Sequence, residues 1–213
     1  MLLVNWLLGP AALGFYSVGV LLAEQVWLLP NAAKLVLFIH VAAEEKERER
    51  AAFTPRVVRV MVLVAVPAAV ILGLAAGPIV ELLFSPRFLP AVRPLRLLLP
   101  GAAAMGIARV LANDIAGRGK PLLNSYIAAV TLALNLGLNL LWIPRLGIAG
   151  AALASTVSYT ATLFARIIIY CRLSGNSWKI VLIPRPGDFS LVMRGIRTSG
   201  IGSAPIEAEE EKM

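Results

Sequence analysis

The strongest constraint in the sequence is the stretch 117–159, in which a short turn joins two long apolar segments. The first apolar segment, 122–141, follows a basic turn at 117–121, and the second begins at Gly147, just after Pro144. A mainly apolar run of about 20 residues is long enough to cross the hydrocarbon core of a bilayer as a helix. The pattern therefore predicts two antiparallel membrane-spanning helices that are joined at one end.

The second helix of this pair carries small residues at steps of three and four, which places them on one helix face. The members of this small-residue face are Gly147, Gly150, Ala151, Ala154, Ser155, Ser158, Thr162 and Ala165. Membrane helices associate through close backbone approach and polar contacts, so the face predicts tight packing against other helices. On the first helix, Asn135 and Asn139 lie one turn apart and are expected to face protein or a cavity rather than lipid.

Composition assigns the chain to the integral membrane proteins. Hydrophobic residues make up 59% of the sequence and charged residues 15%, whereas about 25% of residues are charged in a typical soluble domain. The formal net charge of +8 comes from basic residues in turns and in the tail, which suits anionic lipid headgroups better than nucleic acid. Cys171 and His40 are the only residues of their types, so one chain offers neither a disulfide nor a Cys/His metal site, and no cofactor is expected.

We expect an all-α polytopic helical bundle with five spans, at about 13–41, 57–84, 95–116, 122–141 and 147–172. Residues 1–12 are too short to span and are interpreted as the tail of an incomplete transmembrane helix followed by an outer turn. The segment 173–213 is interpreted as a cytoplasmic interfacial segment with a disordered acidic tail. A fragment of a longer transporter and a gene that encodes half a transporter both agree with this organisation.

Basic residues in alternate connections predict the orientation of the chain in the membrane. The segment 44–59 holds five lysines and arginines, the turn 117–121 holds two, and the segment from Arg172 to the C-terminus holds six, against four in the opposite connections. These three segments, and with them the C-terminus, are therefore predicted to be cytoplasmic. The chain is expected to be a multi-pass protein of the cytoplasmic (inner) membrane of the cell.

Glu24 is an ionisable residue deep inside an expected span. It lies about 16 Å along the helix from Leu13 at the usual helical rise, and so near the middle of the bilayer. A charged group at that depth is unfavourable by about 2.5 to 3.5 kcal/mol on insertion scales and normally faces a cavity or a partner. Two interpretations stay open: a neutral acid in a buried interhelical hydrogen bond, or a site for a coupling ion or a substrate.

Polar residues also interrupt the third expected span, where Arg109 and Asn113 share a face and Asp114 faces Arg118. Arg109 lies about 12 Å from the cytoplasmic end of its helix, so its guanidinium can snorkel to that end. The alternative is that Arg109 lines a cavity and binds an anionic headgroup. In the predicted orientation Lys34 and Arg109 both lie in the cytoplasmic halves of their helices, where they could bind the same ligand.

Short motifs spread along the chain resemble those of the polysaccharide-lipid flippases in the multidrug/oligosaccharidyl-lipid/polysaccharide exporter superfamily. The resemblance extends over most of the chain, to about Ile183-Pro184, and rests on the order and spacing of the motifs together. These motifs are Leu8-Gly9, Leu13-Gly14-Phe15-Tyr16-Ser17, Gly119-Lys120-Pro121, Asn135, Asn139, Ile143-Pro144, Leu146-Gly147, Gly150-Ala151-Ala152 and Ser158-Tyr159.

The resemblance implies a fold and a function. Similar proteins have twelve to fourteen spans in two lobes around a central cavity, and this chain resembles the second six-helix lobe. The resemblance therefore implies two partners, a missing N-terminal lobe and the membrane lipids. They translocate lipid-linked oligosaccharide or polysaccharide precursors, sugars on a polyprenyl pyrophosphate, by alternating access. The candidate substrate-binding residues are then Arg109, Lys34, Asn113, Asn135 and Asn139, and the candidate ion-coupling residue is Glu24.

No enzyme is indicated, because the sequence has no carboxylate dyad, no nucleophile with a nearby histidine, no phosphate-binding loop and no acidic metal cluster. Two other functions remain open beside the flippase. A cation-coupled multidrug antiporter of the same superfamily would use Glu24 as its proton or sodium site. A non-transporting scaffold or remnant lobe would need none of the polar residues for transport.

Overall fold

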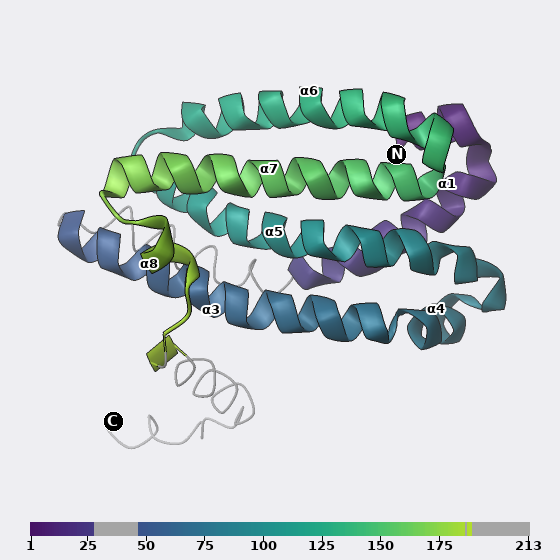
Figure 1. Ribbon diagram of the computed structural model, residues 1–213, viewed down its shortest axis with the longest axis horizontal. Coiled ribbons are helices and arrows are strands. Elements are labelled where there is room, and N and C mark those ends of the chain that lie inside the picture. Colours follow the sequence, from purple (N-terminus) through teal and green to yellow (C-terminus); the bar gives the residue numbers. More distant parts are fainter. Residues whose placement is uncertain (28–46, 186, 189–213) are drawn as a thin grey trace, which may run out of the picture.

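The computed structural model describes residues 1–27, 47–185 and 187–188 (Figure 1). Within these ranges the chain is helical and contains no strand. Its helices are α1 (Leu2–Glu24), α3 (Glu47–Leu74), α4 (Ala76–Phe84), α5 (Val92–Gly117), α6 (Pro121–Leu146), α7 (Ile148–Ser174) and α8 (Trp178–Leu182), with the short 3-10 helices η1 (Gln25–Trp27) and η2 (Pro86–Ala91). Five helical stretches of the described residues are long and apolar enough to cross a membrane, so the chain is a polytopic helical membrane protein, as predicted.

Helix α5 is the centre of the bundle. It packs against α7, α3, α1 and α6, and Figure 1 shows the long helices lying side by side with α5 among them. The most apolar part of the stretch Pro86–Gly117 is 67% buried, compared with 17–28% in the other four spans. The other helices therefore expose apolar side chains on their outer sides, as helices in lipid do.

Small residues let α5 occupy this position. At Gly101 an added Cβ would lie 2.6 Å from Cα of Thr156, so the backbones of α5 and α7 are in contact there. The Thr156 hydroxyl also donates to the carbonyl of Leu97 at 2.5 Å, one residue after the Arg96 carbonyl, which Pro100 leaves without its usual helical donor. Side-chain hydroxyls of neighbouring helices commonly satisfy carbonyls near such prolines in membranes.

The small-residue face predicted on α7 is buried in the bundle. Its buried members are Gly150, Ala151, Ala154, Ser155, Ser158 and Thr162. At Gly150 an added Cβ would collide with the Trp142 carbonyl of α6, so the turn between the two helices is closed tightly. The packing role predicted for this face is confirmed.

The helices differ in places from the spans expected from hydropathy. Helix α1 begins at Leu2 and is interrupted at Gly9, whose φ of 82° is a conformation that glycine readily adopts. Residues 28–41 of the first expected span lie outside the described residues. The second expected span, 57–84, is divided at Ala75 into α3 and α4. Pro78 contributes to this break because it has no N–H to donate to the carbonyl of Leu74.

The described connections that are rich in basic residues lie at one end of the bundle. Figure 1 places the start of α3, the turn between α5 and α6, and α8 together at that end, with α4, η2 and the turn between α6 and α7 at the other. This agrees with the requirement that alternate connections share a side of the membrane. Which end is cytoplasmic stays a prediction.

Candidate functional site

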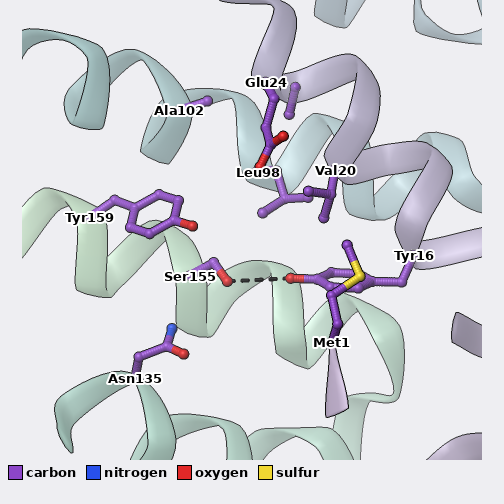
Figure 2. A pocket seen from close by; sticks show the side chains of 10 residues that line it. Met1, Tyr16, Val20, Glu24, Leu98, Ala102, Asn135, Ser155 and Tyr159 are labelled. Atoms are coloured by element: carbon purple, nitrogen blue, oxygen red, sulfur yellow. Dashed lines mark hydrogen bonds between the residues drawn. The ribbon is translucent and has the colours of Figure 1, made fainter. Parts of the chain in front are cut away.

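A polar cavity of about 230 Å³ lies within the bundle, between α1, α5, α6 and α7 (Figure 2). Two of its lining residues show how deep in the membrane it lies, because Asn135 is near the middle of α6 and Tyr159 is near the middle of α7. The residues that line it are Met1, Tyr16, Val20, Ala23, Glu24, Leu98, Ala102, Asn135, Ser155 and Tyr159. The cavity therefore occupies the level at which polar groups are least tolerated unless they serve a site.

Oxygen atoms from α1 and α7 meet in this cavity. The hydroxyl of Tyr16 on α1 and Oγ of Ser155 on α7 are hydrogen-bonded at 3.3 Å, although 139 residues separate them in the sequence. Glu24 lines the same space from the last turn of α1, and Tyr159 lies within electrostatic range of its carboxylate. Figure 2 shows these side chains directed toward one another. Such a set can bind a cation or a proton, and it can hydrogen-bond a hydroxylated ligand.

A second polar cavity of about 270 Å³ adjoins the first and shares Tyr16, Asn135 and Ser155 with it. Asn139 lines it as well, and its side-chain amide donates to Oδ1 of Asn135 at 2.9 Å and to the carbonyl of Asn135 at 2.8 Å. Nδ2 of Asn135 in turn donates to Oγ of Ser158 at 3.3 Å. The prediction that both asparagines face protein or a cavity is confirmed.

Two arginines belong to the helices α5 and α7, which pack against each other. Arg109 of α5 and Arg166 of α7 are close enough to interact electrostatically as like charges, and Arg109 also lies within electrostatic range of Tyr159. Nε of Arg166 and Nδ2 of Asn113 are buried and have no hydrogen-bond acceptor among the described residues. Buried donors are nearly always paired in folded proteins, so an oxygen-rich anion is a fitting partner for this group, which we term the arginine cluster.

The structure groups the predicted site residues in two places. Glu24, Asn135 and Asn139 line the polar cavities. Arg109 and Asn113 lie along α5 in the arginine cluster and do not line those cavities, while Lys34 is outside the described residues. No group of three His, Cys, Asp or Glu side chains that could hold a metal ion occurs in the described ranges.

Sequence reasoning missed Arg166. It follows Tyr159 by seven residues, two helical turns, and therefore lies on the same side of α7 as that tyrosine. Tyr16 and Tyr159 were recognised as parts of motifs and not as site residues. A search for polar residues two turns apart on the small-residue helix would have found Arg166.

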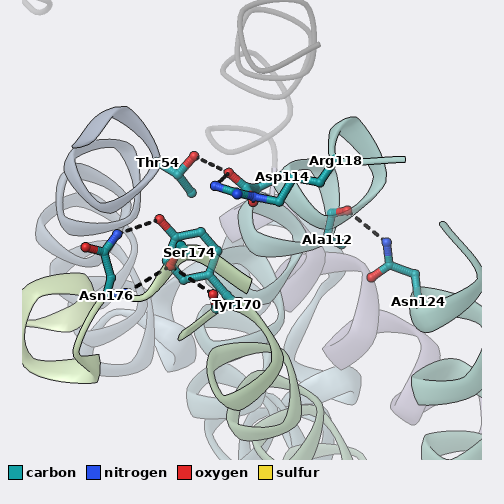
Figure 3. Close-up of polar contacts among 8 residues, drawn as sticks. All are labelled: Thr54, Ala112, Asp114, Arg118, Asn124, Tyr170, Ser174 and Asn176. Atoms are coloured by element: carbon teal, nitrogen blue, oxygen red, sulfur yellow. Dashed lines mark hydrogen bonds and ion pairs between the residues drawn. The ribbon is translucent and has the colours of Figure 1, made fainter. Parts of the chain in front are cut away.

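A separate polar network joins α3, α5 and α7 near the end that carries the basic connections (Figure 3). Asp114 forms the predicted ion pair with Arg118 and accepts a hydrogen bond from the Thr54 hydroxyl at 2.6 Å. The Arg118 guanidinium lies 5.8 Å from the ring centre of Tyr170, whose hydroxyl accepts a hydrogen bond from Nδ2 of Asn176 at 3.2 Å. The network links the three helices, and its charged groups, Asp114 and Arg118, are paired with each other.

The segment after α8 is fastened to α3 by a second ion pair. Nε of Arg59 lies 2.5 Å from Oδ2 of Asp188, and Nη2 donates to Oδ1 at 3.2 Å. Nη1 of the same guanidinium donates to the carbonyl of Ile180 at 2.6 Å. The hydrogen bonds from Arg59 hold the pKa of Asp188 below its usual value. The arrangement positions α8 against α3 and leaves the polar cavities untouched.

Comparison with known proteins places the chain among lipid flippases. The family model described as "Lipid II flippase MurJ" matches residues 23–184. A relative in Methanocaldococcus jannaschii, "Uncharacterized membrane protein MJ1068", is 27% identical over 133 residues, which are 61% of this chain and 26% of that protein. The chain thus spans about a quarter of the length of this relative.

The family match confirms the superfamily to which the sequence motifs pointed. The matching model is that of a lipid II flippase family, and the narrower likeness to polysaccharide-lipid flippases stays a prediction. The family consists of transporters and not of enzymes, in agreement with the prediction made from the residues. The chain belongs to the lipid II flippase MurJ family of the multidrug/oligosaccharidyl-lipid/polysaccharide exporter superfamily.

Proposed function

We propose that this chain forms part of a flippase that carries a polyprenyl-pyrophosphate-linked saccharide of the lipid II kind across the cytoplasmic membrane. The observation that carries the proposal is the polar cavity at mid-depth, bordered by α1, α5, α6 and α7 in a member of a flippase family. A lipid-linked sugar needs a polar path through the bilayer for its headgroup, whereas its tail can stay in lipid. In this proposal a second lobe of the flippase closes the other side of this path.

In this proposal the arginine cluster binds the pyrophosphate. Arg109, Arg166 and Asn113 supply donors and positive charge, and guanidinium groups form strong, charge-assisted hydrogen bonds to phosphate oxygens. An anion between the two arginines would also relieve their mutual repulsion. Lys34 remains a proposed further cation for the same group.

The asparagine pair is proposed to contact the sugar. Asn135 lines both polar cavities, and Asn139 lines the larger one. The hydroxyls of Tyr16 and Ser155 line both cavities as well. Amide and hydroxyl groups both donate and accept hydrogen bonds, so they suit sugar hydroxyls. A lipid-linked oligosaccharide would use the same pyrophosphate site and differ only in its contacts with these residues.

Glu24 is proposed to couple transport to a proton or a cation. Its carboxylate lines the cavity beside Tyr159, and the substrate's pyrophosphate carries negative charge. Binding of a proton or cation at Glu24 therefore alters the affinity for the pyrophosphate, and binding of the pyrophosphate alters the affinity for the proton or cation. The same position of Glu24 favours, as a second candidate function, cation-coupled export of drugs. The two functions differ in their substrate, and a direct assay separates them.

The test is a flipping assay with the full-length protein that contains this chain, reconstituted in liposomes. A fluorescently labelled lipid II is added, and the fraction that an impermeant quencher reaches is followed over time. The proposal predicts protein-dependent exchange of lipid II between the leaflets, with no exchange of a labelled phosphatidylcholine. Absence of lipid II exchange, together with cation-dependent export of a dye from the same liposomes, would assign the protein to the antiporters instead.

A further inference from the structure

An apolar groove of about 430 Å³ runs along the bundle between α3, α5 and α7, on a side of α5 that does not line the polar cavities. Its size falls within the range of about 300–1,000 Å³ that is usual for sites of small ligands. Arg96 is the one charged residue among the described residues that line it, and the rest of the lining is apolar. Val66 and Val70 border the groove and are 45% and 55% exposed, so the groove is open on the side of α3.

The groove has the length of half a bilayer. Its lining on α5 extends from Arg96 to Ile107, eleven residue steps, which is about 16 Å at the helical rise. The hydrocarbon core of one leaflet is about 15 Å deep. Arg96 belongs to the start of α5, next to η2 and the end of the bundle, so the charged part of the groove lies near the headgroups and the apolar part reaches the bilayer centre.

Arg96 is held in place by the backbone of α3. Its Nε donates to the carbonyl of Gly73 at 2.9 Å, in the last turn of α3, where carbonyls lack a partner within the helix. The side chain is exposed, and within the described ranges its Nη1 and Nη2 make no hydrogen bond. Two parallel N–H groups of a fixed guanidinium are a good match for the oxygens of a phosphate.

We propose that this groove binds one acyl chain of an anionic phospholipid, with the phosphate of that lipid held by Arg96. A cation near the membrane surface attracts anionic lipids over zwitterionic ones, and an acyl chain extending from it would end near Ile107 at the bilayer centre. The polyprenyl tail of a lipid-linked sugar is much longer than this groove. None of the residues that line the groove lines the polar cavities, and a lipid bound there would pack against α3, α5 and α7 together.

The first test is native mass spectrometry of the purified protein with dioleoylphosphatidylglycerol or dioleoylphosphatidylcholine added. The wild-type protein is expected to bind phosphatidylglycerol about fivefold more tightly than phosphatidylcholine, and Arg96→Gln is expected to abolish this preference. Arg93→Gln is the matched control, because Arg93 is also exposed at the start of α5 but does not line the groove. An equal loss in both variants, or no loss in Arg96→Gln, would overturn the proposal.

The second test locates the acyl chain. Val66→Cys in a Cys171→Ser background is labelled with a bimane fluorophore, and Leu132→Cys, exposed on α6, serves as a control for bulk lipid. Phosphatidylglycerol with brominated acyl chains should quench the Val66 label more than brominated phosphatidylcholine does, and Arg96→Gln should remove the difference. Equal quenching by the two lipids would contradict the proposal. Displacement of phosphatidylglycerol by undecaprenyl phosphate would also contradict it, because that result would assign the groove to the substrate tail.

Discussion

Replacing Arg166 by glutamine is expected to reduce flipping of lipid II by about tenfold or more at an unchanged level of protein. Charge-assisted hydrogen bonds contribute about 1.5–3 kcal/mol each, and every 1.4 kcal/mol corresponds to about a factor of ten. Arg109→Gln is expected to have a similar effect, and Arg109→Lys should retain part of the activity because it keeps the charge and loses the paired donors. The measurement is the flipping rate in liposomes with the full-length protein.

Stability distinguishes this binding role from a structural one. Because Nε of Arg166 has no hydrogen-bond acceptor among the described residues, Arg166→Gln is expected to leave the thermal stability of the unliganded protein unchanged. Arg172→Gln is the control, since Arg172 is exposed at the end of α7. Full activity of both glutamine variants would mean that the arginines only snorkel, and would leave Glu24 as the main candidate in the cavity.

Gly101→Ala is expected to destabilise the folded protein although it adds a single methyl group. An added Cβ would lie 2.6 Å from Cα and 2.8 Å from Oγ1 of Thr156, so α5 and α7 would have to separate at their closest approach. Overpacking of this kind is unfavourable by about 1–3 kcal/mol. The loss is measured as a lower midpoint of thermal unfolding in detergent and as a smaller yield of monodisperse protein.

The matched control for this substitution is Gly137→Ala on α6. No atom lies within 4 Å of an added Cβ at Gly137, and alanine favours a helix over glycine by about 1 kcal/mol. This variant should be as stable as the wild type or slightly more so. If the two alanine variants lose the same amount of folded protein, the close contact at Gly101 does not hold α5 and α7 together.

The helical class of this protein could be predicted from hydropathy, because a chain in lipid satisfies its backbone hydrogen bonds within each helix. The small-residue face of α7 could also be predicted, since three- and four-residue steps define a face without reference to any neighbour. The break at Ala75 was missed. Pro78, which follows Gly73 and Gly77, contributes to this break. All three residues lie in an apolar run that hydropathy alone treats as one span.

The site could be predicted only in part, for a physical reason. Glu24, Asn135 and Asn139 are conspicuous in apolar segments, because a polar group inside the membrane needs a partner. The contact of Tyr16 with Ser155 depends on how α1 and α7 are rotated relative to each other, and no local pattern encodes that. Arg166 was missed because the sequence argument for α7 used only its small residues, although Arg166 lies as far from the end of α7 as Arg109 does from the end of α5.

The most direct measurement of the central claim is whether the polar cavity belongs to the path of the substrate. Ser155 lines both polar cavities, so Ser155→Cys in a Cys171→Ser background should react with a small water-soluble thiol reagent in the full-length protein in liposomes. Added lipid II should slow this reaction, whereas phosphatidylglycerol should not. Ala152→Cys is the control, because Ala152 is fully buried in α7 at 0% exposure and lines neither polar cavity. A Ser155→Cys thiol that stays unreactive, or that reacts at the same rate with and without lipid II, would contradict the account.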